Sequence, residues 1–497
     1  MCGRRKTSRP CPDQKYVLNG TARFINWRAL SVTHTSLQGG HTAFIGQAGG
    51  STHSARTDTI AIADGELQSV GCWDLDDSPA CLGGYDSGIT VAGSSQLTAT
   101  AYHEERSYMD ENPTIATLGR RLRLACIGGG PGSFIGGVHR QAARTDDRYD
   151  LVAGVFSSSP KKSQQAAMQM GIADDRAYGD PVEMLRLEQK RADGVDVVAI
   201  MTPNDTHFPY AKAALERGFH VICDKPMTNN LEEAQELHDM AIASGLVFCL
   251  THNYTGYPMV RQARAMVEKE ALGELRLVQV EYVQGGNAEP FSDESEGERA
   301  WRHDPGRAGP SLVLGDIGTH AHNLIRFICQ KEVASVSAEV GAIVPGRKSH
   351  DYAGALLHLQ DGGRGNFWVT QAAAGVENTL SIRVSGSRGT LEWSQETPQR
   401  LRYKPIDAPM QTITPNGPGV LPIAARASRI VKGHPEGFTE AFANLYRDAA
   451  DAIASRIAGA SPEPNPLYPT SLDGLRGLQF VEAVLRSSSL DGGWVSP

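Results

Sequence analysis

Five glycines fall within nine residues in the run Gly128-Gly129-Gly130-Pro131-Gly132-Ser133-Phe134-Ile135-Gly136. The apolar segment 122–127 precedes the run and predicts a buried strand, and the pattern after it predicts a helix that begins near Phe134. A glycine-rich turn between a strand and a helix lets the backbone approach a pyrophosphate, which the helix N-terminus then binds. The run therefore predicts a dinucleotide-binding site.

This glycine loop departs from the usual dinucleotide fingerprint, G-x-G-x-x-G. Gly128 and Gly130 fit its first two positions, but Ser133 stands at the third, and Gly136 comes three residues later. The place of the loop between a strand and a helix outweighs this mismatch. We expect the loop to contact the cofactor through Gly128, Gly130, Gly132, Ser133, Phe134 and Ile135.

Strand and helix patterns alternate from the glycine loop onward. Further strands are predicted at 151–156, 195–201, 220–223 and 247–251, with helical patterns between them. Such alternation indicates a doubly wound parallel sheet, so we predict a Rossmann domain over residues 119–253.

The pattern changes after residue 254, where longer segments alternate between apolar and polar residues. They lie at 275–283, 333–344, 353–359, 364–372, 379–385 and 390–394. This pattern predicts a large, mainly antiparallel sheet, with helices near 318–329 and 438–454 covering one of its faces. The overall prediction is an α/β chain in which the Rossmann domain precedes an α+β domain, residues 254–497, built on an open sheet.

Residues 1–118 have a different composition, dominated by Gly, Ser, Thr, Ala and His, and no structural period persists there. They have few apolar side chains to bury, and this burial would not offset the conformational entropy lost on folding. We therefore predict a poorly structured extension. An alternative is that this segment is upstream sequence outside the native protein, with Met109 as the true start.

The composition of the whole chain excludes several classes of protein. A net charge of -8 over 497 residues, with 21% charged and 40% hydrophobic residues, offers no broad basic surface for nucleic acid. The eight cysteines form no C-x-x-C pair and no zinc-type cluster, so we predict reduced thiols, no metal site and a cytoplasmic location. No segment approaches the ~18 apolar residues of a membrane helix, so we expect no membrane partner.

The end of the second predicted strand bears on the choice of cofactor. An NAD site usually has Asp or Glu about 20 residues past the glycine loop, where it accepts a hydrogen bond from the ribose 2′-hydroxyl. Here Ser157, Ser158 and Lys162 stand at that place instead. Because hydroxyls and an ammonium suit a 2′-phosphate, NADP is favoured, and NAD is the alternative.

The fourth predicted strand ends in Asp224-Lys225-Pro226. Ligands of open α/β sheets bind at the carboxyl ends of the strands, so a lysine held there between an acid and a proline is a candidate catalytic residue. The third strand ends in a turn-rich segment at the same edge. We expect residues of these two segments to line the cofactor site, namely Thr202, Pro203, Asn204, His207, Asp224, Lys225 and Pro226.

A carboxylate and an imidazole recur further along the chain, at Asp316 and His320. Residues four apart share a face of an α-helix, so the carboxylate can orient the imidazole and raise its basicity. His320 is therefore the predicted base, with Asp316 as its partner. His320 and His322 do not share a helix face, which disfavours a metal site.

Together these motifs and Asn253-Tyr254 resemble the glucose-fructose oxidoreductase, inositol dehydrogenase and rhizopine catabolism (Gfo/Idh/MocA) family, from about residue 121 to the C-terminus. The usual Glu-Lys-Pro of that family appears here as Asp224-Lys225-Pro226. The long glycine loop and the later His434-Pro435-Glu436-Gly437 resemble a branch of sugar and glycoside dehydrogenases, including ones that oxidise a glucoside at C3.

The resemblance implies an NAD(P)-dependent dehydrogenase that transfers a hydride between a secondary alcohol of a sugar, glycoside or cyclitol and the nicotinamide. His320, oriented by Asp316, would remove the hydroxyl proton, and Lys225 would stabilise the alkoxide; Lys225 as the base is the alternative. Asn253 would contact the cofactor. The residues expected at the substrate are Lys225, Trp301, Arg302, Asp316 and His320. The family also implies a homo-oligomer, a dimer or tetramer formed through the second sheet.

Two other functions fit the same fold. One is a sugar–sugar oxidoreductase with tightly bound NADP, which oxidises one sugar and reduces another. The other is a non-catalytic, nucleotide-sensing regulator. A regulator should have lost Lys225 or the pair Asp316 and His320, and the presence of all three favours an enzyme.

Overall fold

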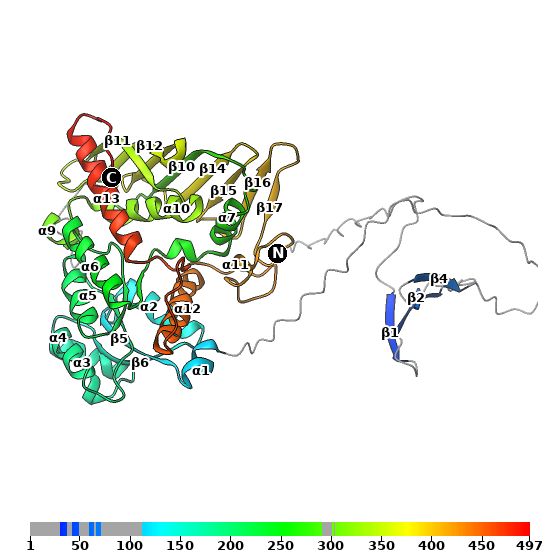
Figure 1. Ribbon diagram of the computed structural model, residues 1–497, viewed down its shortest axis with the longest axis horizontal. Helices are drawn as coiled ribbons and strands as arrows, with labels where there is room; N and C mark the ends of the chain where they lie inside the picture. Colours follow the sequence, from blue (N-terminus) through cyan, green and yellow to red (C-terminus); the bar gives the residue numbers. More distant parts are fainter. Residues whose placement is uncertain are drawn as a thin grey trace, which may run out of the picture. The chain divides into compact units, whose positions relative to one another are not determined.

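The computed structural model describes residues 112–290, 301–302 and 304–497, and the backbone of four strands before them (Figure 1). The chain divides into two compact units, Met1–Tyr102 and His103–Pro497. In the first unit, two antiparallel pairs form: β1 (Leu30–Ser36) with β2 (Thr42–Ala48), and β3 (Thr59–Ala63) with β4 (Glu66–Val70). Most of the extension predicted over residues 1–118 lies outside the described residues.

Helix α1 (Pro113–Leu118) lies within that predicted extension but packs in the second unit. Asn112 caps it by accepting the N–H groups of Thr114 and Ile115. The same side chain donates to the carbonyl of Asp147 at 2.6 Å and accepts from Arg148 Nη1 at 2.6 Å. The folded second unit therefore includes residues before the predicted boundary at 118.

The first sheet of this unit is a five-stranded parallel sheet in the order β6-β5-β7-β8-β9, which confirms the predicted Rossmann fold. Its strands are β5 (Leu122–Gly128), β6 (Tyr149–Val155), β7 (Val197–Met201), β8 (His220–Cys223) and β9 (Phe248–Leu250). The helices between them are α2 (Phe134–Thr145), α3 (Pro160–Gln169), α4 (Pro181–Glu188), α5 (His207–Leu215) and α6 (Leu231–Ser244).

Helix α12 (Phe438–Ile457) covers this first sheet, whereas the sequence pattern assigned it to the second sheet. Its side chains Phe442, Leu445 and Ile453 are buried with Ile222 and Cys249, which lie on β8 and β9. Helices α2 and α3 contribute buried side chains to the same cluster. The chain therefore returns to the Rossmann sheet after building the second one.

The second sheet has eight strands in the order β11-β12-β13-β10-β14-β15-β16-β17. Of the neighbouring strands in this sheet, only β10 and β13 are parallel, so the predicted, mainly antiparallel sheet is confirmed. Its strands are β10 (Leu275–Val283), β11 (Val333–Gly341), β12 (Tyr352–Leu359), β13 (Arg364–Thr370), β14 (Thr379–Gly386), β15 (Gly389–Ser394), β16 (Leu401–Pro405) and β17 (Gln411–Ile413).

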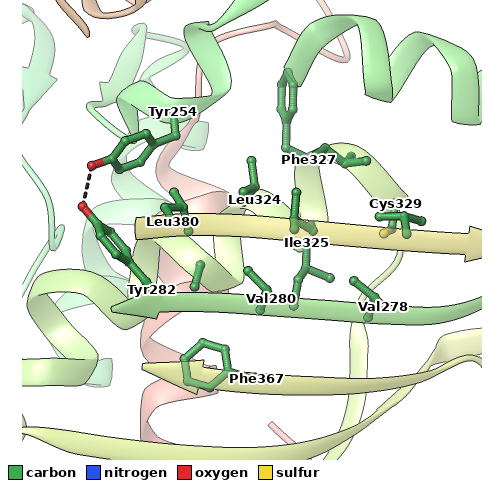
Figure 2. Close-up of a cluster of buried hydrophobic side chains, with 14 of the residues drawn as sticks. Tyr254, Val278, Val280, Tyr282, Leu324, Ile325, Phe327, Cys329, Phe367 and Leu380 are labelled. Atoms are coloured by element: carbon green, nitrogen blue, oxygen red, sulfur yellow. Dashed lines mark hydrogen bonds between the residues drawn. The ribbon is translucent and has the colours of Figure 1, made fainter. Parts of the chain in front are cut away.

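Helices α7 (Pro258–Glu268), α10 (Thr319–Cys329) and α13 (Ser471–Ser489) pack on one face of this sheet (Figure 1). Figure 2 shows Leu324 and Ile325 of α10 above Val278 and Val280 of β10. The opposite face exposes apolar side chains, including Leu277, Leu356 and Trp368. Within the described part of the chain, no helix has the length and apolarity needed to cross a membrane.

Candidate active site

The glycine loop packs between the ends of the two strands that flank β5. A Cβ atom on Gly128 would lie 2.6 Å from the carbonyl oxygen of Met201, at the end of β7. On Gly130 it would lie 2.4 Å from the carbonyl oxygen of Phe156, just after β6. Gly132, with φ +87°, has no heavy atom within 4 Å of its Cβ position and faces open space. The loop thus offers bare backbone, as a dinucleotide pyrophosphate requires.

The late glycine, Gly136, explains the mismatch to the fingerprint. A Cβ atom there would lie 2.2 Å from the carbonyl oxygen of Gly129, so helix α2 packs directly on the loop at this glycine. Ser133 caps the helix, and its Oγ accepts the N–H of Gly136 at 3.1 Å. Helix geometry leaves the N–H groups of Phe134 and Ile135 without intrahelical partners. These N–H groups fit an anionic cofactor at the helix N-terminus.

The end of β6 carries hydroxyls and a cation beside the loop. Ser157 Oγ accepts the N–H of Ser159 at 3.2 Å, and the side chains of Ser158 and Lys162 are exposed. Residues 156–162 contain no Asp or Glu. The place where NAD sites carry an acid is therefore occupied by groups without negative charge.

His207 joins the turn after β7 to the Lys225-Pro226 segment. Its Nδ1 lies 2.8 Å from the carbonyl oxygen of Pro226, and its Nε2 lies 2.9 Å from that of Thr202. The Lys225–Pro226 peptide bond is cis. Asn204 Nδ2 donates to the carbonyl of Ala308 at 3.1 Å, which ties the same turn to the second domain. His207 and Asn204 therefore hold the edge of the site together.

Lys225 reaches from the Rossmann edge to Asp316. Its Nζ donates to Asp316 Oδ1 and to the Asp316 carbonyl oxygen, each at 2.7 Å. The neighbouring Asp224 accepts a hydrogen bond from Thr251 Oγ1 at 2.7 Å, and His139 Nε2 lies 3.9 Å from the same carboxylate. Burial would raise the pKa of Asp224, but His139, Lys225 and Thr251 outweigh it and hold the pKa below its ordinary value.

Asp316 pairs with Lys225, whereas the sequence predicted a pair with His320. The reason is local geometry: Leu314–Gly318 is a π-helical turn, so the α-helical four-residue spacing does not apply. The second carboxylate oxygen accepts Gln371 Nε2 at 2.8 Å. Burial would raise the pKa of Asp316, but the charges of Lys225 and Arg302 and these hydrogen bonds lower it to about 2.

His320 lies on α10 with its ring buried against aromatic neighbours. Its Nδ1 lies 3.3 Å from Nδ1 of His252, and the Tyr254 ring meets it edge-on at a centroid distance of 4.8 Å. Figure 2 shows Tyr254 bonded through its hydroxyl to Tyr282 at this end of the sheet. Burial, with further contributions from Lys225 and His252, lowers the pKa of His320 well below its ordinary value. The imidazole is therefore neutral near pH 7.

The remaining predicted residues lie around this group. Arg302 Nη1 is 4.0 Å from Asp316 Oδ2, and its guanidinium carbon is 5.8 Å from the centre of the Trp301 ring. Asn253 is buried, and its Nδ2 has no hydrogen-bond partner within the described part of the chain. Such an orphaned donor at the strand edge fits a polar group of a bound cofactor or substrate.

Sequence reasoning missed His252 and Gln371. His252 carried a usable signal, because it directly precedes Asn253 at the end of a predicted strand. Gln371 carried none, since its partner lies 55 residues away and depends on the packing of β13. Among the described residues, no group of three or more His, Cys, Asp or Glu is placed to hold a metal ion.

Comparison with known proteins gives matches over both halves of the second unit. The model of the oxidoreductase family, NAD-binding Rossmann fold, matches residues 122–252, and that of the GFO/IDH/MocA C-terminal domain matches residues 260–392. The uncharacterized oxidoreductase YfiI of Bacillus subtilis is 33% identical over 382 residues, which are 76% of this chain and 97% of that protein.

Two solved structures are similar over the same region. An oxidoreductase from Sinorhizobium meliloti is 44% identical with a TM-score of 0.68, and the match covers 76% of this chain and 100% of that one. An inositol dehydrogenase homolog from Azotobacter vinelandii, complexed with NADH and myo-inositol, is 34% identical with a TM-score of 0.71 over 77% and 99%. With its Rossmann sheet, its second sheet and these relatives, the chain belongs to the Gfo/Idh/MocA family of NAD-binding oxidoreductases.

Proposed function

We propose that this chain transfers a hydride between a secondary alcohol of a cyclitol, sugar or glycoside and a nicotinamide dinucleotide. One observation carries the proposal. The Nζ atom of Lys225, at the edge of the Rossmann sheet, lies 2.7 Å from Oδ1 of Asp316, and the same ammonium is close enough to the buried His320 to lower its pKa. A cation, an anion and a neutral base thus converge where ligands of such folds bind. Lys225, Asp316 and His320 are the proposed catalytic residues.

Each of these residues has a distinct task in alcohol oxidation. A neutral imidazole offers one ring nitrogen with a lone pair, so His320 can take the hydroxyl proton. An ammonium has three N–H donors, and within the described residues two of those of Lys225 go to Asp316. The third can donate to the substrate oxygen and stabilise the developing alkoxide. The nicotinamide of a dinucleotide whose pyrophosphate is bound at the glycine loop would supply the hydride acceptor.

A network of carboxamides beside Asp316 supports a polyhydroxylated substrate. Gln371 Nε2 donates to Gln284 Oε1 at 3.3 Å, and Asn287 Nδ2 donates to Gln371 Oε1 at 3.0 Å. Gln284 in turn donates to Asn378 Oδ1 at 2.6 Å. Such groups both donate and accept, as sugar hydroxyls do. The relative bound to myo-inositol supports the same class, and Trp301 and Arg302 are the proposed outer contacts.

For the cofactor, we propose that the site accepts the 2′-phosphate of NADP as well as NAD. The support is the absence of an acid over residues 156–162 and the exposed Ser158 and Lys162. We further propose a homo-oligomer, dimer or tetramer, through the open face of the second sheet. Leu277, Leu356 and Trp368 are 59%, 55% and 41% exposed there, and apolar side chains of this size favour a covered surface.

The direct test is reduction of NAD and NADP by the purified protein with a panel of inositols, glucosides and free sugars. We expect turnover with at least one ring polyol. Cofactor retained through purification, with turnover only when a second sugar is supplied, would favour the sugar–sugar oxidoreductase. If nucleotide binds but no member of the panel is oxidised and no ketone is reduced, the regulator would be favoured and this proposal would fail.

A further inference from the structure

We propose that His252 is a positioning residue that fixes the tautomer of His320 and forms with it a two-imidazole proton relay. This inference rests on the proposed role of His320 as the base. The two residues belong to elements of different sheets, since His252 follows β9 of the first sheet and His320 lies on α10, which packs on the second. Their contact is therefore made only when the two sheets are assembled.

The geometry of the pair requires one shared hydrogen. The two Nδ1 atoms lie 3.3 Å apart. The rings pack edge-on, with 5.1 Å between their centroids and an interplanar angle of 81°. A neutral imidazole carries one N–H and one lone pair, so one Nδ1 donates to the other. His252 is 2% exposed and His320 7%, and solvent does not readily replace this bond.

The position of the shared hydrogen decides what His320 can do. With the hydrogen on Nδ1 of His320, its Nε2 has the lone pair and accepts the alcohol proton. With the hydrogen on Nδ1 of His252, Nε2 of His320 carries the N–H and donates to a ketone oxygen instead. The first arrangement serves oxidation and the second serves reduction, so the pair changes roles when the reaction reverses.

The relay moves protons without any further reactant. In oxidation the substrate O–H bond breaks and an N–H bond forms at Nε2 of His320. The O–H electron pair becomes the second carbon–oxygen bond as the hydride leaves for the nicotinamide. The Nδ1–H bond of His320 then breaks, and the same proton forms an N–H bond at Nδ1 of His252. His252 next releases its Nε2 proton to solvent, so that both rings are neutral again.

The charges around the pair favour transfer toward His252. Burial lowers the pKa of both rings, that of His252 to about 3, so neither holds a second proton for long. His320 has the cation Lys225 nearby, whereas His252 also has the carboxylates of Asp473 and Asp224. The cations Lys225 and Arg326 act in the opposite sense on His252. A proton that His320 takes up beside the cation Lys225 is therefore favoured to move to His252.

The test is nitrogen NMR of the full chain with 15N-labelled histidine, which needs no substrate. We expect a scalar coupling across the hydrogen bond between the two Nδ1 atoms, with one of them protonated. It should vanish in His252→Asn and persist in His322→Asn, a control on the same helix as His320 whose ring is buried against Phe480. Two protonated Nδ1 atoms, or the absence of coupling in the wild type, would overturn the inference.

Kinetics separate this inference from the proposed function. With the most active polyol of the panel, His252→Ala should lower kcat at least tenfold with little change in KM, and added imidazole should restore turnover. If His320→Ala is inactive while His252→Ala has wild-type kcat, the relay fails and the proposed function stands. If His320→Ala retains wild-type kcat, the role of His320 as the base fails and the relay with it, whereas the proposed function fails only if no polyol of the panel is oxidised and no ketone is reduced.

Discussion

Lys225 and Asp316 lie 91 residues apart in the chain, yet the Lys225 ammonium donates to both the carboxylate and the main-chain carbonyl of Asp316. The position of the lysine is thus fixed by a main-chain atom as well as by a side chain. A Cβ atom on Gly315 would lie 4.0 Å from Pro226, an ordinary van der Waals distance, so the segments that carry Asp316 and Lys225 lie next to each other. The proposed catalytic group is assembled across the two sheets.

Asp316→Asn should lower kcat by roughly 10- to 100-fold. The change keeps the shape and the carbonyl bond to Lys225 but removes a charged hydrogen bond of about 1.5–3 kcal/mol, where 1.36 kcal/mol is tenfold in rate. Steady-state kinetics with a ring polyol measure the effect. Asp361→Asn, which removes an exposed ion pair with Lys331, is the control and should leave kcat unchanged. Wild-type kcat in Asp316→Asn would argue against the role of this pair.

Gly130→Ala should weaken NAD binding by about tenfold or more. An added methyl group would meet the Phe156 carbonyl at 2.4 Å and force the loop away from the pyrophosphate. The dissociation constant can be measured by fluorescence titration. Gly137→Ala is a matched control, because nothing lies within 4 Å of that Cβ position. Equal affinity of the two variants would place the cofactor elsewhere.

Ser158→Asp should shift the ratio of kcat/KM for NAD over that for NADP upward by about tenfold or more. A carboxylate there accepts from the ribose 2′-hydroxyl and repels a 2′-phosphate. Lys162→Met should reduce NADP turnover more than NAD turnover. The measurement is kcat/KM with both nucleotides. An unchanged ratio in both variants would remove these residues from the proposed cofactor site.

The pH profile of oxidation should reflect the buried base. An ordinary histidine has a pKa near 6.5, and burial lowers the pKa of His320 well below its ordinary value. The base works in its neutral form, which persists as pH falls through 6.5, so initial rates of kcat/KM should stay flat there and decline only at lower pH. An acidic limb centred near 6.5 would contradict a base whose pKa is lowered by burial.

Much of the fold could be predicted from the sequence, because the spacing of apolar residues along a helix or strand reflects which of its faces is buried. The alternation up to β9 and the longer segments from β10 to β15 give two sheets of different kinds. The place of α12 could not be read in this way. An amphipathic pattern shows that a helix buries one face but does not say which sheet covers it.

The candidate site likewise has parts that could be predicted from the sequence and parts that could not. Lys225 and the glycine loop follow predicted strands, so their common edge could be inferred. The partner of Asp316 could not, because the π-helical turn at Leu314–Gly318 changes which side chains share a face. The contact of His252 with His320 depends on how the two sheets meet, and that of Gln371 with Asp316 on how β13 packs beside the turn before α10, and spacing along the chain carries no information about either.

In the proposed reaction, Lys225 and His320 carry out the chemistry while the glycine loop binds the cofactor. The most direct measurement is single-turnover hydride transfer from a ring polyol to saturating NAD in Lys225→Met and His320→Asn, with cofactor affinity determined for each variant. At saturating NAD we expect a loss of about 1,000-fold or more in each variant, since Lys225→Met removes electrostatic stabilisation and His320→Asn removes base catalysis. Hydride transfer within tenfold of the wild type in either variant would contradict this expectation.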